Sequence, residues 1–273
     1  MRKTLSGLFG FLVIGAVLLT GCGGGGGDTG DTAGGGDAAG PAASETPAAT
    51  TDSGGTPAPT GSATVSGTVN YEGQVPNLRP IDMGADPACA AKHDSPVMPD
   101  MLVLGDGNTM ANIFVQVTNP PEGSYPTPSE PVEIDQRGCS YHPHVVGVRA
   151  GQPLEFMNSD GLLHNVHGLP EANREFNLGM PATVTESATT LNRPEPLFQV
   201  KCDVHPWMQA YVAVMSHPYF AVTDEDGQFT IEGLPAGTYT VEAWHERLGT
   251  QTAEVTVDDG GSATADFTFS APS

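Results

Sequence analysis

The chain has 273 residues, of which 10 are basic and 32 acidic, and its formal net charge at pH 7 is −22. Neutralising a phosphate backbone requires lysine and arginine, so this balance excludes nucleic acid as a partner. A chain of this length holds one or two domains, and its negative charge suits either an ordinary solvated surface or a basic protein partner.

Residues 1–21 have the pattern of an export signal. Two basic residues precede an apolar run over residues 5–19, which is too short to span a membrane as a helix. The run ends in Leu-Thr-Gly-Cys, which resembles a bacterial lipobox. That resemblance implies cleavage before Cys22, a lipid on its sulfur, and a protein anchored in the bacterial cell envelope, on the periplasmic or outer-membrane side. An ordinary signal peptide followed by a chance cysteine is the alternative.

Residues 22–62 are expected to form a flexible tether. After Cys22 they contain no aromatic residue and no leucine, isoleucine, valine or methionine. Such a segment cannot bury enough apolar surface to offset its chain entropy.

Beyond residue 62, short alternating runs separated by Gly, Pro, Asn and Asp predict an all-β protein built from sandwiches. The first runs are residues 64–69 and 112–117, and residues 76–110 between them match no element. Further strands are expected over residues 145–149, 154–157, 162–167, 198–202, 211–215, 228–231, 238–243, 253–257 and 265–269.

One loop carries chemistry. Cys202, His205 and Met208 follow the spacing Cys-x2-His-x2-Met. A thiolate, an imidazole and a weak thioether are ligands of electron-transfer copper, which usually has a second histidine. His164 and His167 are the upstream candidates, and we favour the first. The alternative is a buried core thiol with Met208 as core filling.

The His-Asn-Val-His segment that starts at His164 and the loop from Cys202 to Met208 together resemble cupredoxins, most closely the amicyanin type. The resemblance covers about residues 130–215 and implies a Greek-key β-sandwich with one type 1 copper ion. The implied ligands are three equatorial residues and one weak axial residue: His164, Cys202, His205 and Met208.

The resemblance also assigns roles around the ligands. The backbone N–H of Asn165 is expected to donate to the Cys202 sulfur and tune its potential. Pro206 restricts the backbone of His205 and keeps the loop rigid. An exposed edge of His205, together with Trp207, would be the electron port. Its expected neighbours are Pro206, Leu162 and Leu163.

The remaining cysteines, Cys89 and Cys139, are expected to pair, because an exported protein is exposed to oxidising conditions. Closing the loop of 50 residues between Cys89 and Cys139 would stabilise the fold by about 4 kcal/mol. A second metal site of Cys139 with His142 and His144 is the less favoured alternative. The pair His245-Glu246 follows a strand and is read as exposed surface.

The C-terminal part resembles the carboxypeptidase regulatory-like, or transthyretin-like, β-sandwich over residues 223–239. The segment 217–273 is too short for a complete module, and residues 66–73 resemble the usual opening of that family. We therefore expect a split sandwich, formed by residues 63–125 with 217–273, around an inserted cupredoxin domain of residues 126–216. The hypothesis fails if residues 64–70 pair only with strands of the inserted domain.

The sequence contains no recognisable Ser-His-Asp, paired-carboxylate or phosphate-cradling motif, and one His-x-His pair is too few for a trinuclear oxidase centre. We therefore do not expect an enzyme, and the resemblance implies a non-catalytic regulatory-like module. The predicted function is an envelope lipoprotein that carries single electrons on one copper ion between redox partners, with a basic partner favoured by charge. Copper storage or delivery and a structural or adhesion role are the alternatives.

Overall fold

The computed structural model describes residues 57–271. The predicted signal peptide, the lipidation site Cys22 and nearly all of the predicted tether lie outside these residues. Within them, helical structure is confined to α1 (Pro87–Ala90) and the 3₁₀ turn η1 (Asp106–Asn108), and the other elements are strands. The predicted all-β class is confirmed. No helix in the described range is both long and apolar enough to cross a membrane.

The first sandwich is built from the two ends of the folded chain. One sheet has the order β13-β1-β16, with β17 also paired to β1, and the other has the order β12-β2-β14-β15. The bounds are β1 (Ala63–Glu72), β2 (Phe114–Val117), β12 (Phe220–Val222), β13 (Gln228–Leu234), β14 (Gly237–His245), β15 (Gly249–Val257), β16 (Ser262–Thr264) and β17 (Phe267–Ser270).

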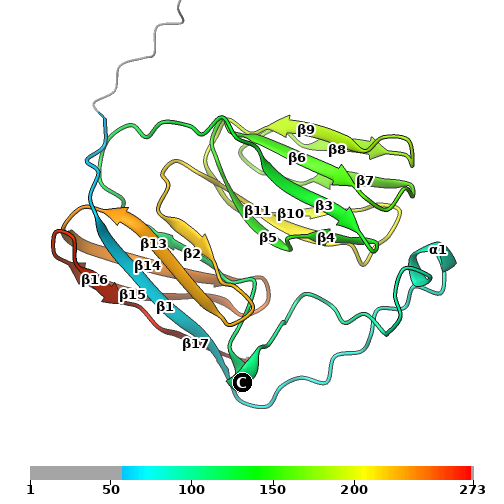
Figure 1. The fold of residues 1–273 in the computed structure, drawn as a ribbon, viewed down its shortest axis with the longest axis horizontal. Helices are drawn as coiled ribbons and strands as arrows, with labels where there is room; N and C mark the ends of the chain where they lie inside the picture. Colours follow the sequence, from blue (N-terminus) through cyan, green and yellow to red (C-terminus); the bar gives the residue numbers. More distant parts are fainter. Residues whose placement is uncertain (1–56, 272–273) are drawn as a thin grey trace, which may run out of the picture. The chain divides into compact units, whose positions relative to one another are not determined.

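The pairing of β1 is what the split-sandwich hypothesis requires. β1 runs antiparallel to β13, with Val65 opposite Ile231, and parallel to β16 and β17. β2 runs antiparallel to β12 and β14. Among the described strands, β1 has no partner in the inserted segment. Figure 1 shows the cyan β1 beside the orange β13, although most of the chain lies between them in sequence.

The second sandwich comes from the inserted segment. Its sheets have the orders β4-β3-β6-β9 and β5-β11-β10-β7-β8. The bounds are β3 (Val132–Arg137), β4 (Ser140–His142), β5 (Val145–Arg149), β6 (Pro153–Asn158), β7 (His164–Gly168), β8 (Phe176–Met180), β9 (Glu186–Thr190), β10 (Glu195–Lys201) and β11 (Gln209–Met215).

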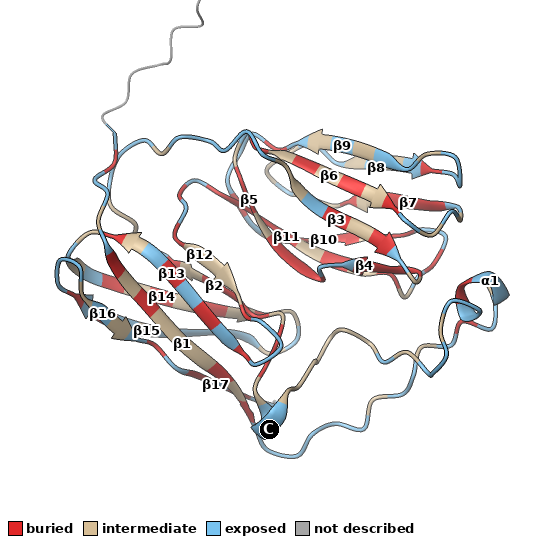
Figure 2. Ribbon diagram, viewed as in Figure 1, coloured by how far each residue is buried: buried red, intermediate tan, exposed pale blue. Residues whose placement is uncertain are grey.

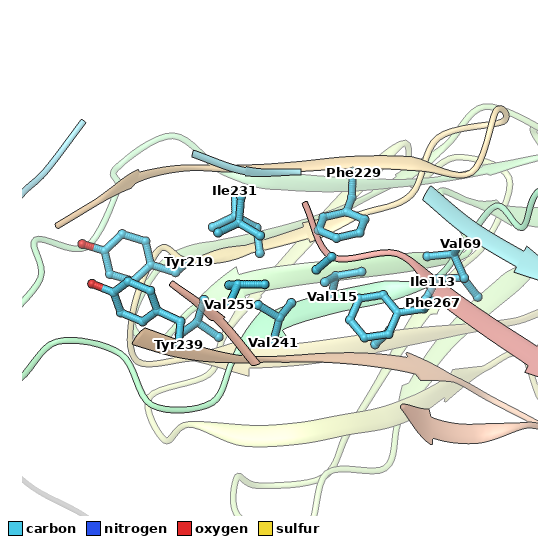
Figure 3. Close-up of a cluster of buried hydrophobic side chains, with 14 of the residues drawn as sticks. Val69, Ile113, Val115, Tyr219, Phe229, Ile231, Tyr239, Val241, Val255 and Phe267 are labelled. Atoms are coloured by element: carbon cyan, nitrogen blue, oxygen red, sulfur yellow. The ribbon is translucent and has the colours of Figure 1, made fainter. Parts of the chain in front are cut away.

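Each sandwich has its own hydrophobic core, which follows from period-two alternation along the strands. In β13, Phe229 and Ile231 are buried whereas Gln228 and Thr230 are exposed. Figure 2 shows the same alternation as red and pale bands along the strands. In Figure 3, Phe229 and Ile231 point toward Val241 from the facing sheet.

A third buried cluster joins strands of the two sandwiches, and its fully buried members are Phe114, Val145, Ala213 and Met215. Nearby, His144 Nε2 lies 2.7 Å from Glu246 Oε1, and the Tyr211 hydroxyl donates to Glu246 Oε2 at 2.9 Å. The expectation that His245-Glu246 forms exposed surface is therefore wrong. His245 is buried, and the Glu246 carboxylate is held between residues of both sandwiches.

Gly67 tests the contact between the two halves of the first sandwich. A Cβ added there would lie 1.9 Å from the Ala265 carbonyl oxygen and 2.9 Å from the Phe229 ring. Overpacking of this kind costs about 1–3 kcal/mol, so Gly67→Ala should lower the free energy of unfolding by at least that amount in a denaturant titration. Gly179→Ala, whose Cβ would meet nothing within 4 Å, is the control. Equal stability of the two variants would contradict the packing.

His217 predicts an acid-sensitive stability. Its Nδ1 accepts the Tyr219 backbone N–H at 3.2 Å, and burial, together with the charge of Arg149, lowers the pKa of His217 to about 4. In the unfolded chain a histidine protonates near pH 6.5, so the unfolded state gains the proton first as the pH falls. Stability should therefore fall between about pH 6.5 and 4, by up to about 1.4 kcal/mol per pH unit. Unfolding curves should lose this component in His217→Gln and keep it in His142→Gln, which changes an exposed histidine.

Candidate metal centre

The predicted ligands come from one strand and one loop of the second sandwich. His164 is the first residue of β7, whereas Cys202, His205 and Met208 lie between β10 and β11. Of β10, only the C-terminal residues Val200 and Lys201 pair with β7, so the first residues of β7 extend past the end of β10. On its other side β7 pairs with β8. This register places the start of β7 against the loop.

Three electron-rich atoms converge there. His164 Nδ1 lies 3.0 Å from His205 Nδ1, and the Cys202 sulfur lies 3.8 Å from the same His205 nitrogen. One ligand atom from each of the three residues lies within 4.8 Å of the others. The exposed fractions of His164, Cys202 and His205 are 0%, 2% and 2%. Met208 is also buried, in the same hydrophobic cluster as Cys202.

Hydrogen bonds fix the conformation of the loop from Cys202 to Met208. The Cys202 N–H donates to the Met208 carbonyl at 3.1 Å, and the Met208 N–H donates to the His205 carbonyl at 2.9 Å. The His205 N–H points at the Cys202 sulfur at 3.4 Å. Asn165 ties the loop to β7, because its Oδ1 accepts the Asp203 N–H at 2.7 Å. These four hydrogen bonds close the loop on itself and join it to β7.

The groups around Cys202 favour ionisation of its thiol. Burial alone would raise its pKa, but the His164 side chain and three backbone N–H groups lower the pKa of Cys202 to about 7. Those N–H groups belong to Asn165, His205 and Val204, and the first is the contact expected from the sequence. A large share of the thiol is thus thiolate at neutral pH, which is the form that binds metals.

Asp160 holds the outer nitrogen of His164. Its Oδ2 lies 3.0 Å from His164 Nε2, and the carboxylate accepts the N–H groups of Gly138 and Cys139, both at 2.7 Å. Burial would lower the pKa of His164, but Asp160 and then Cys202 raise it to about 9. Sequence reasoning took Asp160 as a turn residue and missed this role.

A segment of no predicted structure covers His205. Asp86 Oδ2 lies 2.9 Å from His205 Nε2, and the Cys89 sulfur lies 3.4 Å from the same nitrogen. The expectation that His205 exposes an edge as an electron port is therefore wrong, because residues around α1 cover that edge. The signal that could have found Asp86 is its place three residues before Cys89.

The predicted disulfide between Cys89 and Cys139 is confirmed. It fastens α1 to the turn between β3 and β4, next to the ligands. Trp207 lies between the disulfide and His205. Its Nε1–H donates to the Cys139 carbonyl at 3.0 Å, and its ring centroid is 5.2 Å from that of His205. Trp207 is partly exposed. Leu163 and Val204, each next to a ligand residue in the chain, are 54% and 44% exposed.

The other histidines stay outside the cluster. His167 pairs with Asp203 at 2.9 Å and with Glu175 at 2.8 Å. The alternative second metal site is wrong, because Cys139 is in a disulfide and His144 is bound to Glu246.

The donor set fits a cation with mixed soft and borderline preferences. Both Nε2 atoms are taken by carboxylates, so the two Nδ1 atoms face each other and the Cys202 thiolate. A thiolate, two imidazoles and a nearby methionine match copper better than calcium or magnesium, which prefer oxygen ligands.

A family model matches the C-terminal part of the chain, from the ligand loop to β17. The model of the carboxypeptidase regulatory-like domain matches residues 205–270. No curated protein matches the chain.

Solved structures with partial similarity include copper proteins. A copper-containing nitrite reductase from Thermus scotoductus SA-01 is 20% identical, with a TM-score of 0.30, over 32% of this chain and 23% of that one. A Cu(I) form of an amicyanin mutant is 21% identical, with a TM-score of 0.28, over 31% of this chain and 82% of that one. A purple cupredoxin from Nitrosopumilus maritimus is 19% identical, with a TM-score of 0.26, over 30% of this chain and 98% of that one.

Asp160→Asn should destabilise the protein even without metal. The change leaves the imidazole of His164 without its carboxylate and places an amide against two backbone donors. Breaking a buried pair on one side costs roughly 3–5 kcal/mol, measurable by denaturant unfolding of the metal-free chain. Asp259→Asn, which removes an exposed carboxylate, is the control. A change of less than about 1 kcal/mol in Asp160→Asn, which is the size expected for an exposed ion pair, would contradict the role given to Asp160.

Proposed function

We propose that this protein binds one copper ion at the candidate metal centre and carries single electrons between redox partners. The observation that carries the proposal is the convergence of the Cys202 sulfur with Nδ1 of His164 and of His205 within 4.8 Å, at buried positions. These three residues would hold the ion, with Met208 as a weaker fourth ligand. Copper bound there would supply a one-electron couple.

The surrounding chain favours electron transfer over storage. The ligand loop is closed by its own hydrogen bonds, and both imidazoles are held at their outer nitrogens. A framework of this kind changes little between oxidation states, which lowers the cost of rearrangement. A storage or delivery protein has to release its ion, and burying the ligands under α1 works against release.

Electron exchange would use the partly exposed residues beside the buried ligands. Trp207 is the candidate, because its ring lies 5.2 Å from that of His205 and its Nε1–H is bonded to Cys139. Leu163 and Val204 add exposed apolar surface for contact with a partner. The net charge of −22 favours a partner that is basic.

Export and lipid attachment complete the proposal. Cys22 follows an apolar signal and precedes a segment rich in glycine and alanine. A lipid on Cys22 and a flexible tether would let the folded part reach partners near the membrane of the bacterial envelope. The proposed role is not enzymatic, and the regulatory-like sandwich would be structural.

Copper titration of residues 23–273 tests the proposal. Cu(II) should bind at one ion per chain and give an intense blue thiolate-to-copper absorption, with reversible one-electron cycling at an electrode. Cys202→Ser should lose the colour, His164→Ala should weaken Cu(II) binding by at least about 10-fold, and His167→Ala should change neither. Binding without reversible cycling would favour storage or delivery. Absence of copper binding would leave the structural or adhesion role.

A further inference from the structure

We propose that Asp86 is a positioning residue of the metal centre, brought to His205 by a disulfide-anchored cap. The cap is the segment of residues 81–97, which includes α1 and is closed by the Ile81 N–H donating to the Val97 carbonyl at 2.8 Å. The inference rests on the proposed function and adds a determinant of the reduction potential. It assigns a role to a segment whose sequence has no regular pattern.

The geometry of Asp86 leaves one oxygen for His205. Its Oδ1 accepts the backbone N–H groups of Ala88 at 3.0 Å and Cys89 at 3.3 Å. Its Oδ2 lies 2.9 Å from His205 Nε2. The orientation of the carboxylate is therefore set by the first turn of α1, and it does not depend on the histidine.

Several contacts hold the cap against the second sandwich. The disulfide joins Cys89 to Cys139, and the buried Met83 belongs to the hydrophobic core of that sandwich. Lys92 Nζ lies 3.2 Å from Asp160 Oδ1, and His93 Nε2 lies 2.7 Å from the Gly138 carbonyl oxygen. Asp86 is thus fixed relative to the ligands, although its side chain is 35% exposed.

This placement has a definite chemical consequence. An ionised carboxylate only accepts hydrogen bonds, so Asp86 selects the form of His205 that carries its proton on Nε2 and turns the Nδ1 lone pair toward Cys202. A carboxylate on the outer nitrogen also makes an imidazole a stronger ligand. Its negative charge favours the more positive oxidation state of a bound ion, which lowers the reduction potential.

Asp86 differs from Asp160 in its origin. Asp160 holds the outer nitrogen of His164 in the same way, but Asp160 lies four residues from His164 in the same domain. Asp86 is 119 residues from His205 and reaches it only through the cap. The disulfide therefore links the redox state of Cys89 and Cys139 to the position of a ligand histidine.

The test compares Asp86→Asn, which removes the charge but can still accept a hydrogen bond, and Asp86→Ala, which removes both. Asp94→Asn is the matched control, because it removes a carboxylate from an exposed position on the same cap. Loss of an outer carboxylate typically weakens metal binding 10–100-fold. We expect a loss of about 10-fold in Cu(II) affinity with little change for Cu(I), which corresponds to a rise of about 59 mV in potential.

A second measurement needs no copper. In the metal-free chain, imidazole ¹⁵N shifts should show His205 protonated at Nε2 in the wild type and in Asp94→Asn. Asp86→Ala should lose this preference. Because this result does not involve copper, a failure of copper binding would contradict the proposed function while the role of Asp86 is still judged by the shifts.

Opening the disulfide tests whether the anchor of the cap acts through the Asp86 carboxylate. Cys139→Ser opens the disulfide but keeps the Cys89 sulfur that lies 3.4 Å from His205 Nε2. It should shift the His205 ¹⁵N signals and the potential in the same direction as Asp86→Ala, and adding Asp86→Ala should then change little more. Additive effects would show that the disulfide does not act through Asp86. Potentials and ¹⁵N shifts that are the same in Asp86→Ala and in Asp94→Asn would overturn the proposal.

Discussion

The candidate metal centre depends on holding two imidazole nitrogens 3.0 Å apart and a cysteine sulfur beside them. Electron-rich atoms at this distance repel each other unless a proton or a cation lies between them, so the chain has to fix each residue from outside. It does so by three independent means. β7 supplies His164, the closed loop supplies Cys202 and His205, and carboxylates hold the outer nitrogens.

The order of the chain explains where the cap comes from. β1 and β2 are in opposite sheets of the first sandwich, and the segment between them includes the cap. The chain thus leaves β1 after Glu72, covers His205 in the second sandwich, and is back in the core of the first at Met110. Both ends of the covering segment are fastened by strand pairing. The split sandwich therefore has a structural task at the metal centre, since it supplies the segment that carries Asp86.

The sequence predicted the parts of this structure that depend on short-range patterns. Alternation predicted most of the longer strands, but it missed β3, β4, β8 and β9 of the second sandwich and β12 and β16 of the first. The spacing of Cys202, His205 and Met208 predicted the loop, because all three lie within one hairpin connection. Contacts between distant segments were harder to predict. Asp86 is 119 residues from His205, so no local pattern joins the two. Asp160 lies only four residues before His164, but its sequence context is that of a turn residue. The burial of His205 was missed for the same reason, since its cover comes from a segment 119 residues away.

The two sandwiches also share a packed interface. Phe114 ends the connection that carries the cap, and it packs in the cluster that contains Met215 from the strand that follows the ligand loop. The buried pair of His144 and Glu246 lies between the two sandwiches as well. Both routes from the first sandwich to the metal centre, through the cap and through β11, therefore start from one packed interface.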